Sequence, residues 1–286
     1  MTKRSSALES TIEDLVERAK MGDKNVLGEI IRRIQDNIYG LALRMLFIPA
    51  DAEDATQEIL VKVITHLGTF RGESRFDTWV YRIAANHLLT MRKSRAERWQ
   101  MTFQVCVNLI EEEALVRKDE TFVEAEQKLI AEETKLACVH YLLLCLKREL
   151  RLPFILGEIF GIKNREGAEI LELTPTVYRQ RLSRGRKQIM DFLIGQCSLV
   201  DSNNPCHCED LAVLHVKKGH IDPKNPFFVC HPRRNSQAED LQMELDQLAK
   251  AAILIRNHPR YAAPGVLVES MKGLIDSGKY QLLGRA

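Results

Sequence analysis

Apolar residues recur at helical spacing through most of this 286-residue chain, and this periodicity constrains the fold more than any other feature. One long example places Leu27, Ile30, Ile34 and Ile38 three or four positions apart, along one face of a helix. Aromatic residues make up only 6% of the chain, so a residue type that favours strands is scarce. The sequence therefore predicts an all-α protein.

Chain length and composition predict more than one domain. A chain of 286 residues suits two or three domains of ordinary size. We expect a first small helical domain over 1–95, a polar and acidic linker over 96–133, and a second helical domain over 134–195. A mostly helical C-terminal extension over 196–286 begins with an irregular segment that contains cysteine and histidine.

Residues 165–187 have the pattern of a helix–turn–helix. Thr174 is expected to cap the second helix, with Pro175 at the first helical position. Gly167 is awkward in the first helix, where glycine costs about 1 kcal/mol relative to alanine. A basic helix can read guanine edges and neutralise phosphates, although it could also be a solvated cationic face. The candidate DNA-binding residues are Thr176, Arg179, Gln180, Arg181, Arg184 and Arg186.

A longer motif lies in the first domain. The run DAEDATQE (51–58) precedes RGESRFDTW (71–79), and YRIAAN (81–86) follows. In order, and in nearly every residue, this resembles the extracytoplasmic function (ECF) sigma factors, whose pattern is D-A-E-D-x-x-Q-E, then F-R-G-E-S-x-F-x-T-W-x-Y-R-I-A-x-N. The basic helix is similar to the second promoter-reading domain of that family. The resemblance covers about residues 12–195.

The resemblance implies a sigma factor that binds core RNA polymerase and directs promoter-specific initiation, with sigma region 2 first and region 4 second. The helix–turn–helix would hold the −35 duplex. The residues implied to dock on the clamp helices of the polymerase are Asp51, Asp54, Gln57 and Glu58, for which helix capping is the plainer role. Those implied for the single-stranded −10 element, with Asn86 lining a pocket for a flipped base, are Arg82, Asn86, His87, Arg92 and Lys93. The alternative is a DNA-binding regulator that uses only the helix–turn–helix.

Cysteines in the C-terminal extension form a candidate site for zinc or another thiophilic metal, because thiolates are ligands that such ions prefer. The candidate ligands are Cys197, Cys206, Cys208 and Cys230. Thiol redox sensing and unliganded cysteines are the alternatives. Cys106, Cys138 and Cys145 are expected to be buried core thiols. Some sigma factors of this class carry cysteine-rich extensions that regulate them, so the resemblance implies that this extension regulates the chain.

Several function classes are disfavoured. The N-terminus has no apolar core of signal-peptide length, and no segment reaches the roughly 18 apolar residues that span a bilayer, so we expect a cytoplasmic protein without a membrane partner. We find no phosphate-binding loop, no paired catalytic carboxylates and no convincing nucleophile–base pair. The sequence therefore predicts a protein that is not an enzyme.

Overall fold

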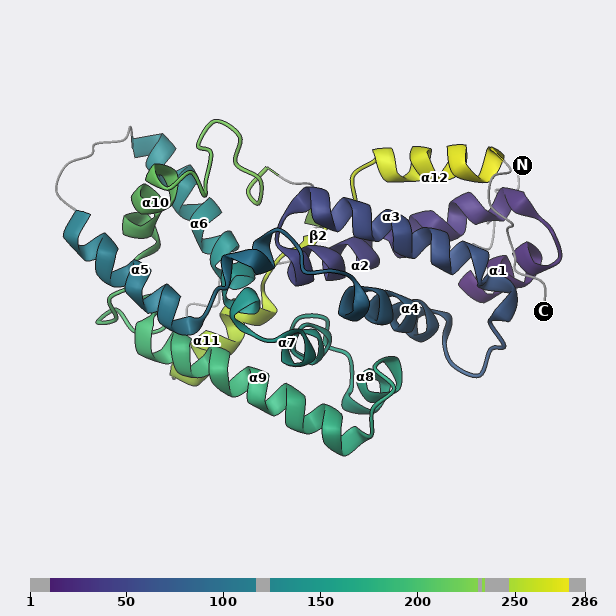
Figure 1. Cartoon of the computed structure of the whole chain (residues 1–286), viewed down its shortest axis with the longest axis horizontal. Helices are drawn as coiled ribbons and strands as arrows, with labels where there is room; N and C mark the ends of the chain where they lie inside the picture. The colour runs from purple at the N-terminus through teal and green to yellow at the C-terminus, as the bar shows by residue number, and fades with distance from the viewer. Residues whose placement is uncertain (1–10, 117–123, 231–232, 235–246, 278–286) are drawn as a thin grey trace, which may run out of the picture.

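The protein is all-α, as its sequence predicts (Figure 1). The computed structural model describes residues 11–116, 124–230, 233–234 and 247–277. In these ranges the only sheet is the antiparallel pair of β1 (Arg233–Arg234) and β2 (Arg260–Tyr261). No helix in the described part of the chain is long and apolar enough to cross a lipid bilayer.

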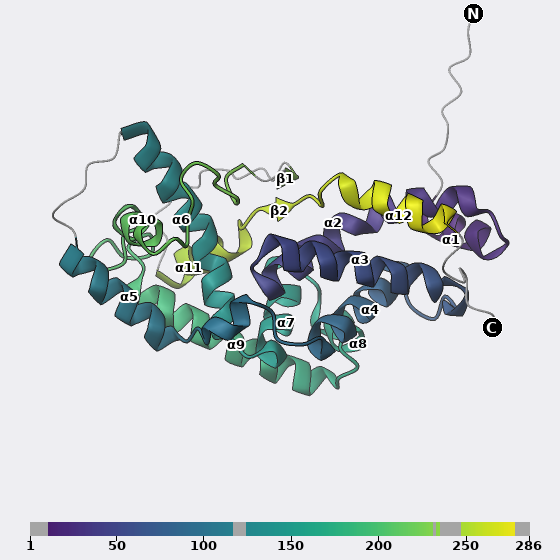
Figure 2. The same ribbon diagram turned by 45° about the horizontal axis from the view of Figure 1, so that its top comes forward.

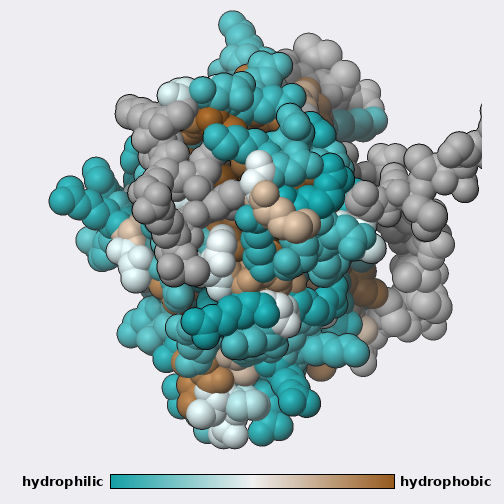
Figure 3. Space-filling model, turned by 90° about the vertical axis from the view of Figure 1, so that its right-hand side faces the viewer, coloured by the Kyte–Doolittle hydropathy of each residue, from teal (hydrophilic) through white to brown (hydrophobic). Residues whose placement is uncertain are grey.

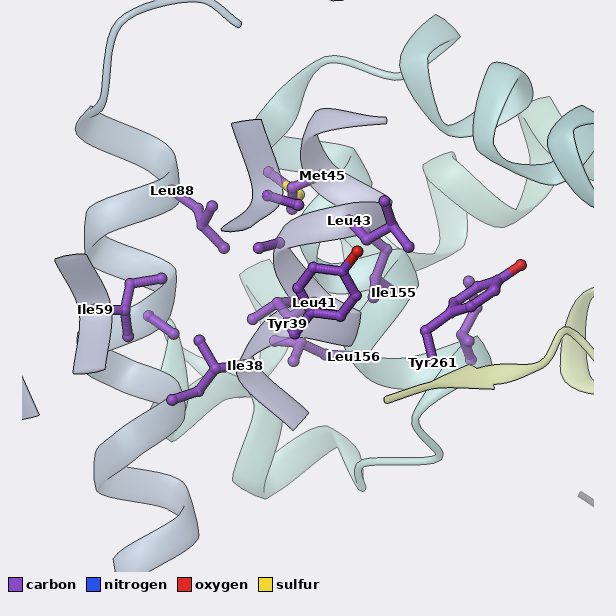
Figure 4. Packing of buried hydrophobic residues seen from close by; sticks show 14 of the residues in the cluster. Ile38, Tyr39, Leu41, Leu43, Met45, Ile59, Leu88, Ile155, Leu156 and Tyr261 are labelled. Atoms are coloured by element: carbon purple, nitrogen blue, oxygen red, sulfur yellow. The ribbon is translucent and has the colours of Figure 1, made fainter. Parts of the chain in front are cut away.

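The N-terminal bundle is built around α2 (Leu27–Leu46), whose periodic apolar residues are buried as predicted. Figure 4 shows Ile38 of α2 beside Ile59 and Leu88, which belong to two neighbouring helices. Pro49 stands in the first turn of its helix, where the missing N–H costs no hydrogen bond. The other helices of this bundle are α1 (Ile12–Lys20), α3 (Pro49–Thr65) and α4 (Phe76–Thr90), with 3-10 turns at Lys24–Val26 and Leu67–Thr69.

The segment 96–133, predicted to be a polar linker, is helical over much of its described length. A 3-10 turn at Ala96–Trp99 leads to α5 (Phe103–Val116), and α6 (Glu124–Cys145) begins before the segment ends. Ile110 of α5 shares an apolar cluster with Leu211 and Leu214 of the C-terminal extension. Helix α5 therefore gains its stability from a partner that is distant in sequence, which explains why its own weak periodicity did not predict it.

The second helical domain contains the predicted helix–turn–helix. The hydroxyl of Thr174 accepts a hydrogen bond from the N–H of Val177 at 3.3 Å, so this residue is the expected N-cap. Helix α6 ends at Cys145, and a shorter helix follows. The elements after α6 are α7 (Arg148–Phe154), a π-turn at Ile155–Ile159, α8 (Asn164–Ile170) and α9 (Pro175–Gln196).

Gly167 in α8 has a packing role that the sequence did not reveal. A Cβ atom at this position would lie 2.3 Å from Cζ of Tyr178, a buried residue of α9. The Tyr178 hydroxyl donates a hydrogen bond to the carbonyl of Pro153 at 3.3 Å, so the ring cannot easily move away. Glycine therefore allows α8 and α9 to pack closely.

The C-terminal extension spreads over the whole molecule rather than folding apart from it (Figures 1 and 2). Its first helix, α10 (Cys208–Lys217), packs on α5 and α6. Helix α11 (Gln247–Arg256) packs on α9, and α12 (Val266–Asp276) lies along α2 and α3 at the far end. Figure 3 looks onto that end, where the surface is mostly hydrophilic with only small apolar areas.

Candidate polymerase and promoter interface

The acidic residues proposed for polymerase docking lie in the first half of α3. Asp54 and Glu58 are exposed, and Gln57 is half-buried. Asp51 is different, because its carboxylate lies 2.6 Å from the guanidinium of Arg95 and also accepts a hydrogen bond from the Arg95 backbone N–H at 3.1 Å. Asp54 and Glu58 are therefore accessible to a partner, whereas Asp51 fixes the segment that follows α4 against the start of α3.

The residues proposed for the −10 element divide into two groups. Asn86, Arg92 and Lys93 are exposed, at and beyond the end of α4. Arg82 is half-buried, and its guanidinium lies 3.5 Å from the carboxylate of Glu169 and 4.0 Å from that of Glu172. Both acids belong to the helix–turn–helix of the second domain.

His87 lies beneath this surface. Its side chain is only 7% exposed, with Nδ1 2.7 Å from the ammonium of Lys62 and Nε2 3.8 Å from the carboxylate of Glu58. Burial, together with the nearby Lys62 charge, lowers the pKa of His87. In this arrangement its ring supports the packing of α4 on α3 and does not line an open path for a DNA strand.

The residues proposed for the −35 element form a largely exposed stripe on α9. Arg181 is half-buried within the stripe. Arg186, at the end of the stripe, is exposed but forms an ion pair with the buried carboxylate of Glu158, and Arg256 of α11 lies 3.8 Å from the same carboxylate. The exposed members are Thr176, Arg179, Gln180, Arg184 and Arg186.

A buried ionic cluster that the sequence did not predict joins the two domains. Glu97, which follows α4, accepts hydrogen bonds from Arg148 at 2.8 Å and from Arg151 at 3.2 Å. Arg148 also donates to the carbonyl of Met91 at 2.7 Å, and Arg151 bonds the carbonyl of Met45. Burial is the largest single influence on Glu97 and raises its pKa, but the hydrogen bonds from Arg148 and the Ser94 N–H, together with the charges of Arg151 and Arg148, outweigh it, and the pKa is lowered. The cluster fixes the start of α7 against the end of the first domain.

A second unpredicted contact surrounds Arg44 of α2, which is 1% exposed. Its guanidinium donates to the carbonyl of Pro259, lies 3.2 Å from Nδ1 of His258, and packs on the rings of Phe160 and Tyr261. Burial lowers the pKa of Arg44 to about 10, so the side chain keeps its charge at neutral pH. The first domain, the second domain and the C-terminal extension therefore meet at one buried cation.

Three of the four proposed metal ligands, Cys197, Cys206 and Cys208, lie between the end of α9 and the start of α10. Cys197 and Cys206 are joined by a parallel bridge, and Cys208 begins α10. Cys230 is an exposed turn residue. No group of three or more His, Cys, Asp or Glu side chains among the described residues is arranged to hold a metal ion.

Of the three cysteines expected to be buried core thiols, Cys106 is buried, whereas Cys138 and Cys145 are half-buried. The sulfur of Cys106 lies 3.6 Å from that of Cys145. Cys138 lines an apolar cavity together with Cys206 and Cys208. Sequence reasoning therefore placed Cys138 in the core but did not connect it with the cysteines of the extension.

Comparison with known proteins identifies the family. Residues 30–98 match the model for sigma-70 region 2. RNA polymerase sigma-H factor of Pseudomonas aeruginosa is 31% identical over 180 residues, which cover 62% of this chain and 91% of that protein. ECF RNA polymerase sigma-E factor of Haemophilus influenzae is 29% identical over 182 residues, covering 63% of this chain and 93% of that protein.

A solved structure of CnrH in complex with the cytosolic domain of CnrY also matches, with a TM-score of 0.45 and 21% identity, over 63% of this chain and 94% of that chain. The matches to curated relatives extend well beyond the helix–turn–helix, so the alternative of a regulator that uses only that motif is set aside. The chain therefore belongs to the ECF RNA polymerase sigma factors, non-enzymatic proteins that direct promoter-specific transcription initiation.

Proposed function

We propose that this sigma factor docks on the clamp helices of core RNA polymerase through α3, captures the −10 strand with α4 and holds the −35 duplex with α9. We further propose that its C-terminal extension keeps it in a closed, inactive arrangement until a signal releases it. The polymerase-docking residues are then Asp51, Asp54, Gln57 and Glu58, and the cytoplasm is the site of action.

One observation carries the proposal of a closed arrangement. Arg82, on the helix assigned to the −10 strand, lies against Glu169 and Glu172 of the helix–turn–helix. Thr78 on the same helix donates a hydrogen bond to Glu166 of α8 at 3.1 Å. A DNA phosphate would have to replace these carboxylates at Arg82 and would be repelled by them. Promoter capture by α4 therefore requires α8 to move away.

The C-terminal extension supplies the contacts that oppose this movement. Residues 258–276, which we call the strap, run from the buried His258 past β2 to α12. At one end the strap surrounds Arg44, and at the other Leu267 and Met271 are buried in the same apolar core as α2 and α3. Separation of the strap would expose a guanidinium and two apolar side chains to water.

The strap does not cover the whole of α3. Asp54 and Glu58 remain exposed with α12 in place. We therefore propose that polymerase docking can precede release of the strap, and that the closed form blocks promoter reading rather than binding to the core enzyme.

Transcription in vitro with core polymerase tests both parts. We expect the full chain to give low promoter-specific initiation, and a chain that ends at Asn257 to give several-fold more. The full-length variant Leu267→Glu should behave like the shortened chain, because it places a charge in the α12 contact. Val266→Glu on the same helix is the matched control, since Val266 is 60% exposed.

The outcomes separate the two claims. If no form of the protein raises promoter-specific transcripts above core enzyme alone, the assigned promoter contacts fail. If the shortened chain and Leu267→Glu initiate no better than the full chain and Val266→Glu, inhibition by the strap fails. In the shortened chain, Asn86→Ala should reduce opening and Arg181→Ala should reduce use of the −35 element, as the residue assignments require.

A further inference from the structure

We propose that Cys138, Cys197, Cys206 and Cys208 together bind a thiophilic metal ion, Zn²⁺ or Cu⁺, where the C-terminal extension meets the second helical domain. This set replaces Cys230 of the sequence prediction with Cys138 of α6. The proposal concerns metal binding alone and does not depend on the proposed inhibition by the strap.

The fold brings these four cysteines together from separate elements. Cys197 follows the last residue of α9, and its bridge to Cys206 is formed by two backbone hydrogen bonds. In these, the N–H of Cys206 donates to the carbonyl of Gln196 at 2.9 Å, and the N–H of Ser198 donates to the carbonyl of Cys206 at 3.1 Å. Cys208 then begins α10, which packs along α6, where Cys138 lies.

The cavity between these elements offers soft ligands. Its volume is about 50 Å³, and its lining includes Cys138, Cys206 and Cys208 together with Cys106 and His215, while Cys197 lies beside it through the bridge to Cys206. The remaining lining residues are apolar or uncharged, and no carboxylate, lysine or arginine is among them. Sulfur ligands in apolar surroundings favour Zn²⁺ and Cu⁺ over ions that prefer oxygen ligands.

Burial raises the pKa of the Cys197 thiol, and backbone N–H groups of Leu199 and Val200 that hydrogen-bond to its sulfur oppose this rise. A metal ion at this site must therefore displace the proton of the thiol, because the thiolate is the form that coordinates a metal.

No three ligating side chains among the described residues stand in coordination geometry, so the thiols of this set would have to turn toward one another to share an ion. Each coordinated thiol would release its proton to the solvent, so binding should weaken as the pH falls.

Metal binding by the full-length protein, purified without oxygen and stripped of metal, tests the proposal. Zn²⁺ and Cu⁺ are added in separate experiments against a competing chelator, and bound metal is counted per chain. We expect one ion per chain for at least one of the two. Cys138→Ser should weaken binding by roughly tenfold or more, whereas the control Cys230→Ser should bind like the wild type.

A spectroscopic measurement on the unchanged protein covers the case in which Cys138→Ser fails to fold. Co²⁺ bound by the wild type should show intense sulfur-to-metal charge-transfer absorption that excess Zn²⁺ removes. Binding by Cys138→Ser as tight as that of the wild type would overturn the ligand set. Failure of the wild type to retain either ion against the chelator, together with absence of the cobalt band, would overturn the site itself.

Discussion

The guanidinium of Arg82 in α4 lies 3.5 Å from the carboxylate of Glu169 in α8, so a side chain assigned to the −10 strand is held by an acid of the −35 domain. We predict that the double variant Glu169→Gln, Glu172→Gln raises promoter-specific initiation a few-fold, because it weakens this contact without altering an assigned DNA contact. The effect is limited to a few-fold because exposed ion pairs contribute little, about 1 kcal/mol at most.

The matched control for this prediction is Glu149→Gln, which removes the same kind of charge from an exposed position of the second domain. Initiation by core polymerase with each variant is the measurement. Equal rates for the double variant and for Glu149→Gln would show that the contact at Arg82 does not restrain promoter capture.

Replacement of Gly167 by alanine should destabilise the helix–turn–helix. Because the added Cβ would lie 2.3 Å from the ring of Tyr178, the free energy of unfolding should fall by about 1–3 kcal/mol. Gly195→Ala in α9 is the control, since a Cβ there meets nothing within 4 Å and should change stability by less than about 1 kcal/mol. Urea unfolding followed by circular dichroism compares the two variants, and equal stability would contradict the packing role of Gly167.

The elements that the sequence predicted well are those that depend on local patterns. The apolar spacing of α2 and the Thr174 cap of α9 follow from neighbouring residues, and both agree with the structure. The exposed stripe on α9 follows from the polar residues on one helix face. The long ordered motif in α3 and α4 depends on residue identity and order alone, and these are enough to indicate the family.

The rest depends on residues that meet only through the fold. Nothing near Arg44 in the sequence indicates that Pro259 and Tyr261 will enclose it. Cys138 lies in an apolar helical stretch, so its nearness to the extension cysteines is a property of the packing of α10 on α6. Helix α5 likewise needs α10. All of these contacts involve the extension, which lies outside the part of the chain, about residues 12–195, that resembles the family.

His87 should make stability depend on pH. Burial and the Lys62 charge lower the folded-state pKa of His87 below its usual value of 6.5, so the unfolded chain binds more protons just below pH 6.5. The stability that neutral His87 contributes is therefore complete above pH 6.5 and is lost as the pH falls from there toward the folded-state pKa. Urea unfolding at pH 7.5, 6.5 and 5.5 should show this decline.

The variant His87→Gln should reduce that decline, whereas His66→Gln, at the exposed end of α3, should retain it. The comparison stays above pH 5 because the stability gained from ionised Glu97, whose pKa is lowered, is lost only in more acidic solution. An undiminished pH dependence in His87→Gln would show that another group carries the effect.

Glu133 should anchor the extension to α6. Its carboxylate, 3% exposed at the residue level, accepts hydrogen bonds from the backbone N–H groups of Phe227, Phe228 and Val229 at 2.8, 2.9 and 2.7 Å. Glu133→Gln replaces one acceptor oxygen by a donor that faces these N–H groups, and should cost about 1–3 kcal/mol locally. Hydrogen exchange of these three amides should then become faster, with little change in α2.

The adjacent Glu132→Gln is the control, because Glu132 pairs only with Lys135 at the surface in the described contacts. If both variants exchange these amides at the wild-type rate, Glu133 does not hold the segment in place.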